Sequence, residues 1–146
     1  SFLPAEINSA FLWAQLESLD TIQARRKEIW NMYHEGLKDL AANGCFSMPD
    51  MPDYATNNAH MFYIVCRNLE ERTGLIAYLK EHEALAVFHY LSLHLSEYYK
   101  EHHEGEIPDL PNCDRFADCL VRLPMYYELK VEDVNMVINT IKDFYK

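Results

Sequence analysis

The chain has 146 residues, of which 49% are hydrophobic and 13% are aromatic. This content is sufficient for one packed core, and the chain is too short for two ordinary domains, so we expect a single α+β unit. The formal net charge of −10 opposes a nucleic-acid backbone or an anionic membrane surface as the main partner. No apolar run of the sequence approaches membrane-spanning length. We therefore expect neither nucleic acid nor a membrane among the partners.

The sequence opens on a long helical pattern. Apolar residues recur at helical spacing over residues 4–42, and the Asn-Gly pair at 43–44 is typical of a helix end. Residues 7–16 are apolar on nearly all sides, which is typical of a helix covered from several directions. We expect another domain or subunit to pack there. Because the chain begins at Ser1 without a methionine, we interpret it as a piece of a longer polypeptide.

The rest of the chain alternates short strand and helix patterns. In chain order, the expected elements are a Pro- and Asp-rich loop (47–57), a strand (58–66), an amphipathic helix (70–82), a strand (85–88), a polar loop (100–113), a short helix (114–120), a strand (121–123) and a closing helix with an apolar stripe at Val134, Val137, Ile138, Ile141 and Phe144.

Side-chain directions follow from these elements. Residues alternate between the two faces of a strand, so His60 and Phe62 are expected on one face of the first strand. In the helix that follows, Leu69, Ile76 and Leu79 are expected to point inward.

Polar rings stand among apolar residues in two segments, 58–65 and 87–94. Burying such rings requires hydrogen-bond partners, so they need a reason to be there. If one small sheet brings the two segments together, His89, Tyr90 and His94 lie where the second segment leaves the sheet, at the opening of a cleft. The sequence therefore predicts a cleft lined by His and Tyr side chains.

The four cysteines contain no C-x-x-C pair and have apolar or aromatic neighbours: Cys45, Cys66, Cys113 and Cys119. We interpret them as buried, reduced thiols of a cytosolic protein. A metal ion is a possible use of the His- and Glu-rich segment, which contains His89, His94, Glu101, His102, His103 and Glu104. His89 and His94 do not stack on one helix face, and the other histidines fall in a polar loop, so we expect no metal site.

The sequence contains neither a serine-nucleophile motif nor a glycine-rich phosphate-binding motif. No serine stands in a G-x-S-x-G sequence, and the four glycines are isolated rather than gathered in a phosphate-binding loop. An anionic ligand would need a local basic site. Beyond the first helix the candidates are Arg67, Arg72, Arg115 and Arg122, and the sequence does not choose among them.

Four segments of the sequence form a recognisable set. They are Phe-Leu-Pro-Ala-Glu-Ile-Asn-Ser-Ala at 2–10 with Ala-Gln-Leu-Glu at 14–17, Asn-Ala-His-Met-Phe-Tyr-Ile at 58–64, residues 87–94 followed by the Tyr pair at 98–99, and Arg-Leu-Pro at 122–124. In this order and at these spacings they resemble the C-terminal part of the DegT/DnrJ/StrS family of pyridoxal-phosphate-dependent sugar-nucleotide aminotransferases, which have the aspartate-aminotransferase fold (fold type I). Together they span nearly the whole chain.

The resemblance implies a small C-terminal domain over residues 1–146, with a long N-terminal helix and a small, mainly antiparallel sheet packed with helices, cut from a homodimeric cytoplasmic enzyme. Within the family the sequence is most similar to members that use glutamate and pyridoxal phosphate to aminate C4 of a dTDP-4-keto-6-deoxyhexose. These members form dTDP-4-amino-4,6-dideoxygalactose for surface polysaccharide such as enterobacterial common antigen.

By position in the family's H-Y-x-x-x-H motif, the resemblance assigns His89, Tyr90 and His94 to the sugar and cofactor cleft. Ser1 falls where many members have an asparagine that reaches the cofactor phosphate of the partner subunit. Three residues depart from the family pattern: Leu3 replaces arginine, Ser92 replaces a common proline, and Lys130 replaces the usual Ser or Thr cap of the last helix.

The family's lysine motif, S-F-H-x-x-K, has no counterpart in these 146 residues. The chemistry needs that lysine and an acid on the pyridinium nitrogen. We therefore expect the chain by itself to be inactive and the cofactor to be bound mainly by a domain outside it.

The alternative from another class is a stand-alone interaction module that docks a partner through its apolar N-terminal helix. A metal-dependent hydrolase is a more distant third.

Overall fold

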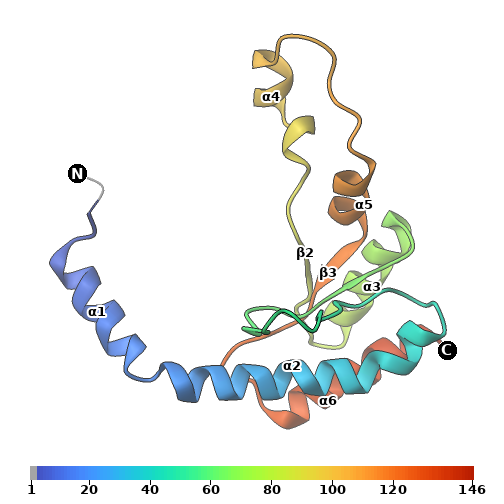
Figure 1. Ribbon diagram of the computed structural model, residues 1–146. Coiled ribbons are helices and arrows are strands. Elements are labelled where there is room, and N and C mark those ends of the chain that lie inside the picture. Colours follow the sequence, from blue (N-terminus) through green and yellow to red (C-terminus); the bar gives the residue numbers. More distant parts are fainter. Residues whose placement is uncertain (1–2) are drawn as a thin grey trace.

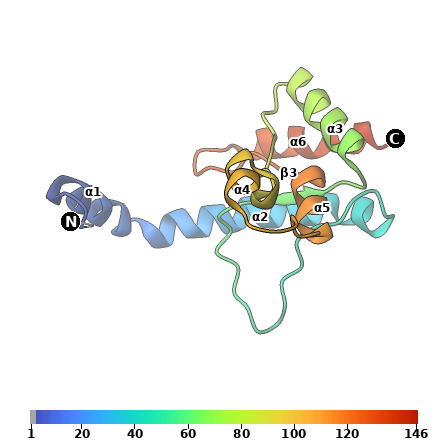
Figure 2. The ribbon, with the colours of Figure 1, turned by 90° about the horizontal axis from the view of Figure 1, so that it is seen from above.

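The structure is a computed structural model that describes residues 3–146. Its longest helix, α2 (Leu19–Ala42), lies side by side with the closing helix α6 (Val131–Phe144) in both views (Figures 1 and 2). The remaining helices are α1 (Glu6–Leu16), α3 (Leu69–Glu81), α4 (Glu97–His102) and α5 (Pro111–Cys119), with a 3₁₀ turn at Leu93–Leu95. No helix in the described part of the chain is both long and apolar enough to cross a membrane.

Three short strands form one antiparallel sheet: β1 (Tyr63–Val65), β2 (Val87–Phe88) and β3 (Leu120–Arg122). The strand order is β1-β3-β2, so the last strand of the chain lies in the middle. Val121 is opposite Ile64 on one side and opposite Phe88 on the other. The expected α+β class with a small antiparallel sheet is therefore confirmed.

The core lies where α2, α3 and α6 meet the sheet. Tyr33 of α2 is fully buried, and its hydroxyl donates a 2.9 Å hydrogen bond to the carbonyl of Pro124. Burial raises the pKa of that hydroxyl well above its usual range. The rings of Trp30 and Tyr33 both pack against Phe62. The expected stripe of α6 is confirmed for its four buried members, which are Val134, Val137, Ile138 and Ile141.

The first helical pattern forms two helices rather than one. The helix breaks between Leu16 and Leu19, and α1 leaves the end of α2 at an angle and projects away from the body (Figure 1). No residue of α1 is buried, and Phe11 and Trp13 are 70% and 68% exposed. The sequence predicts that another element covers this apolar helix, but the described part of the chain leaves its side chains exposed.

The first expected strand is shorter than predicted. Only residues 63–65 pair in the sheet, because two asparagines before them bind the backbone locally. The Asn57 side chain accepts from the Ala59 amide at 2.8 Å, and Ala59 has a positive φ of 50°. The predicted shared face of His60 and Phe62 is therefore wrong: His60 is exposed, whereas Phe62 is fully buried.

The helix predicted at 70–82 is α3. Asn68 caps it by accepting a 2.8 Å hydrogen bond from the Glu71 amide. Leu79 points inward as expected and Ile76 is half-buried. The expectation for Leu69 is wrong, because this residue is exposed at the first helical position and Leu75 is the buried one.

The strand predicted at 85–88 pairs over only two residues, Val87 and Phe88. Beyond Phe88 the chain runs out of the sheet, passes through the 3₁₀ turn and α4, and returns along a loop to α5 (Figure 1). We call residues 89–110 the arm. The polar loop predicted at 100–113 begins after His102, and Pro111 starts α5 at a position that suits proline.

Two glycines in helices have opposite surroundings, and they yield a stability prediction. A Cβ on Gly36 would lie 2.7 Å from Cδ1 of Ile138 where α2 meets α6, whereas a Cβ on Gly74 would have only ordinary contacts with Phe144. Gly74→Ala should therefore raise the free energy of unfolding by about 0.5–1 kcal/mol, because alanine favours the helix. The free energy of unfolding of Gly36→Ala should be lower than that of Gly74→Ala by about 1 kcal/mol or more, because Ile138 must shift. Urea unfolding of both variants measures this, and equal gains would contradict the close approach of the two helices.

Candidate functional site

A groove of about 630 Å³ lies between the arm and α5. The sequence after β2 supplies one wall, α4 and the returning loop supply a second, and the first turns of α5 supply the third. Its lining is almost entirely apolar and aromatic, apart from two histidines, a serine and a cysteine. The lining residues are His89, Tyr90, Leu91, Ser92, Leu93, His94, Tyr99, Pro108, Leu110, Cys113, Phe116 and Ala117.

His89 and Tyr90 stand at the sheet end of this groove. Their rings meet edge to face, with centroids 4.7 Å apart, and Tyr90 is 71% exposed. The Nδ1 atom of His89 is buried and has no hydrogen-bond partner among residues 3–146. The guanidinium carbon of Arg122 lies 5.9 Å from the centre of the Tyr90 ring, and its Nε also lacks a partner within the described chain. These groups form a compact set of donors whose hydrogen bonds are not all used.

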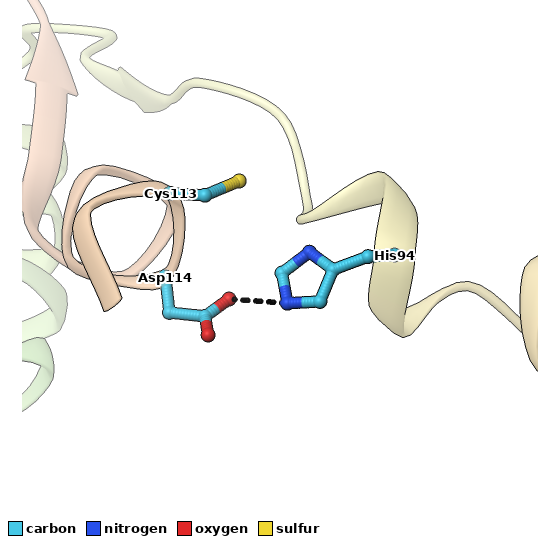
Figure 3. Close-up of side chains that lie close together, drawn as sticks. All are labelled: His94, Cys113 and Asp114. Atoms are coloured by element: carbon cyan, nitrogen blue, oxygen red, sulfur yellow. Dashed lines mark ion pairs between the residues drawn. The ribbon is translucent and has the colours of Figure 1, made fainter. Parts of the chain in front are cut away.

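His94 lies deeper, with only 6% of its surface exposed. Figure 3 shows its ring directed at the first turn of α5, where its Nε2 is 3.5 Å from Oδ1 of Asp114. Its Nδ1 is buried and finds no partner in the described residues. His94 therefore forms part of the groove wall, and one edge of its ring faces a small polar cluster.

Ser92 connects that cluster. Its hydroxyl donates a 2.6 Å hydrogen bond to Oδ1 of Asp114 and accepts one from the Cys113 thiol at 3.6 Å. Sequence reasoning identified Ser92 only as a departure from a common proline and missed its partners, because the contact joins residues more than twenty positions apart. The signal that was available is that a buried serine, unlike proline, needs a hydrogen-bond partner.

The structure brings the three predicted residues, His89, Tyr90 and His94, to one groove. It does not bring the other histidines there. His102 and His103 are exposed and stack on Tyr98 and Tyr99 within α4 and its end, so the segment rich in His and Glu forms no single cluster. Ser1 lies outside the described residues.

All four cysteines are free thiols, but they are not all buried as expected. Cys66 and Cys119 are buried, and burial raises the pKa of the Cys66 thiol to about 11. Cys45 is half-buried, and Cys113 is exposed on α5. The expectation of burial is wrong for Cys113, because the first turn of α5 faces the groove rather than the core.

The four candidate arginines differ in their partners. Arg67 pairs with Glu71 at 2.8 Å, Arg72 donates to the carbonyl of Asp118, and Arg115 lies over the ring of Phe116. Arg122 is the one that stands beside the groove with a buried, unpartnered Nε. Geometry thus favours Arg122 as a contact for an anionic ligand.

Residues 5–142 match the DegT/DnrJ/EryC1/StrS aminotransferase family. The chain belongs to this family. A member from Brucella abortus is 28% identical, with a TM-score of 0.75 over 91% of this chain and 34% of its own. DesV from S. venezuelae is 25% identical, with a TM-score of 0.81 over 94% of this chain and 35% of its own.

A Streptococcus pneumoniae protein classed as a sugar aminotransferase is known in a PLP form and a PMP form. It is 24% identical, with a TM-score of 0.76 over 90% of this chain and 33% of its own. That protein thus binds pyridoxal 5′-phosphate, and this chain spans about a third of the length of the structures it matches.

The groove does not by itself suit that cofactor. A pyridoxal phosphate site needs a lysine for the Schiff base and cationic or amide donors for the phosphate. No lysine or arginine lines the groove, and none of the seven lysines is buried. The residues present fit a neutral, partly aromatic portion of a ligand, so no reaction step is assigned to this chain alone.

Proposed function

We propose that this chain is the C-terminal part of a pyridoxal-phosphate-dependent aminotransferase that uses glutamate to aminate C4 of a dTDP-4-keto-6-deoxyhexose. The product would be dTDP-4-amino-4,6-dideoxygalactose, a precursor for surface polysaccharide such as enterobacterial common antigen. Family membership and the placement of His89, Tyr90 and His94 around one groove support the proposal. The reactive lysine is supplied by the rest of the enzyme.

In this proposal the groove receives the sugar end of the nucleotide sugar. An apolar and aromatic lining suits the face of a deoxyhexose, and ring nitrogens supply the few directed hydrogen bonds that fix its orientation. The buried, unpartnered Nδ1 of His89 supports this role, because such an atom gains a partner when a ligand binds. His94 shapes the wall, and Tyr90 covers the mouth.

The uncovered surfaces are proposed to meet the rest of a cytoplasmic homodimer. The α1 helix carries large exposed apolar residues with no cover in the described chain, and so does the arm, at Leu91 and Leu93. Large apolar side chains exposed along one element support an interface there. Ser1 is proposed to reach the cofactor phosphate of the partner subunit, as its position in the family pattern implies.

The proposal is tested by His89→Ala in the enzyme that carries this chain. We expect kcat/KM for the nucleotide sugar to fall about tenfold or more, since a hydrogen bond of this kind contributes about 1.5 kcal/mol. The melting temperature should move by no more than a few degrees, because Nδ1 has no partner to lose. His102→Ala, which changes an exposed ring of α4, is the matched control and should alter neither quantity. Equal losses of melting temperature and activity would show that His89 is only a packing residue.

Arg122 is proposed to contact the diphosphate. It is the arginine beside the groove whose Nε has no partner within residues 3–146, and its ring contact with Tyr90 connects it to the proposed sugar site. A planar guanidinium suits phosphate oxygens, since it donates two parallel hydrogen bonds.

Arg122→Gln should raise KM for the nucleotide sugar about tenfold or more, because a charge-assisted hydrogen bond contributes about 1.5–3 kcal/mol. KM for glutamate should change much less. Steady-state kinetics with each substrate varied in turn measures both values, and Arg115→Gln is the control, since Arg115 lies over Phe116 instead. A larger effect on glutamate than on the nucleotide sugar would assign Arg122 to the amino donor and overturn this role.

A further inference from the structure

Three side chains with metal-binding atoms converge where the arm meets α5. His94 comes from the 3₁₀ turn of the arm, and Cys113 and Asp114 come from the first turn of α5. One ligand atom from each lies within 4.8 Å of the others. Figure 3 shows the imidazole facing the Asp114 carboxylate, with the Cys113 thiol on the same side of α5 near the ring. We propose that this cluster binds a zinc ion that fastens the arm to α5.

The hydrogen bonds of His94 do not account for its burial. Only 6% of the side-chain surface is exposed. Nevertheless, Nδ1 has no hydrogen-bond partner in the described chain, and the nearest partner of Nε2 is Asp114 at 3.5 Å. A buried ring without good hydrogen bonds costs about 1–3 kcal/mol. A zinc ion at Nε2 would replace its long approach to Asp114 with a metal–nitrogen bond and so remove part of this cost.

The spacing of the atoms fits zinc. The 3.5 Å between Nε2 of His94 and Oδ1 of Asp114 is long for a hydrogen bond. Two ligands about 2.0–2.2 Å from a tetrahedral zinc ion lie about 3.4 Å apart, which agrees with this separation. Cys113 is exposed, and its Sγ lies within 4.8 Å of the other two ligand atoms, so a rotation about its Cα–Cβ bond would close the remaining distance.

The chemistry of the three groups favours zinc over other cations. Imidazole nitrogen and thiolate sulfur are ligands of zinc, whereas calcium and magnesium take oxygen ligands almost exclusively. Binding would displace the thiol proton, and the resulting thiolate and the carboxylate balance the two charges of the ion. Three protein ligands leave one position open to water.

Ser92 holds the cluster in place from outside. Its hydroxyl donates to the Asp114 carboxylate, which is the role that outer hydrogen bonds play around metal ligands. The hydrogen bond from the Cys113 thiol to Ser92 would be given up when the thiol proton leaves.

The site is tested with Co²⁺, which occupies zinc sites and reports a thiolate ligand by its charge-transfer absorption. After treatment with a chelator, the purified protein should bind Co²⁺ with that absorption, and Zn²⁺ should displace it. Cys113→Ser should abolish the absorption, and Asp114→Asn should weaken Zn²⁺ binding about tenfold or more in competition with a chromogenic chelator.

Two controls separate this site from other binding. Cys45→Ser changes another thiol, and His102→Ala changes an exposed histidine of the polar segment; both should keep the thiolate absorption and the Zn²⁺ affinity. Because Cys113 is exposed, Cys113→Ser should leave the circular dichroism spectrum unchanged. Absence of the thiolate absorption, its persistence in Cys113→Ser, or its loss in His102→Ala would overturn the proposal.

Discussion

The pairing of β3 with strands on both its sides is the constraint on which the rest of the structure depends. Val121 is opposite Ile64 and Phe88 at once, so the chain that leaves the sheet at Phe88 must return to the neighbouring strand. The arm is therefore an excursion whose two ends are held side by side. Because strands of two or three residues are not stable alone, the buried stripes of α2, α3 and α6 hold the sheet that anchors the arm.

Two surfaces of this small fold are left without a cover. The apolar side chains of α1 and of the arm face solvent in the described chain, although the core beneath the sheet is well packed. Both surfaces lie away from that core, at the α1 end of the molecule and along the arm (Figure 1). The chain spans about a third of the length of the related structures, and exposed apolar surface of this kind is typical of an interface.

The sequence predicts best the elements whose signals are local. The α3 helix has a capping asparagine and a helical period, the stripe of α6 is continuous, and β3 is a short apolar run before a proline, so all three lie within a few residues of their expected positions. The break between α1 and α2 has no proline or glycine to mark it, and the helical period continues across it. The loss of strand at 58–62 was missed because the asparagine side chains replace ladder bonds that the apolar pattern leads one to expect.

The candidate site likewise combines residues from one contiguous motif with residues from elements distant in the sequence. His89, Tyr90 and His94 were identified from one contiguous motif, and the groove gathers all three. Arg122, Cys113 and Asp114 come from later elements, and only the β2–β3 pairing and the return of the arm place them beside that motif. Ser92 shows why this matters: read alone it is one departure from a family pattern, but in space its hydroxyl connects the arm to α5 through two hydrogen bonds. A single substitution in a motif can thus add a contact that the motif does not encode, and its meaning depends on what the fold brings opposite to it.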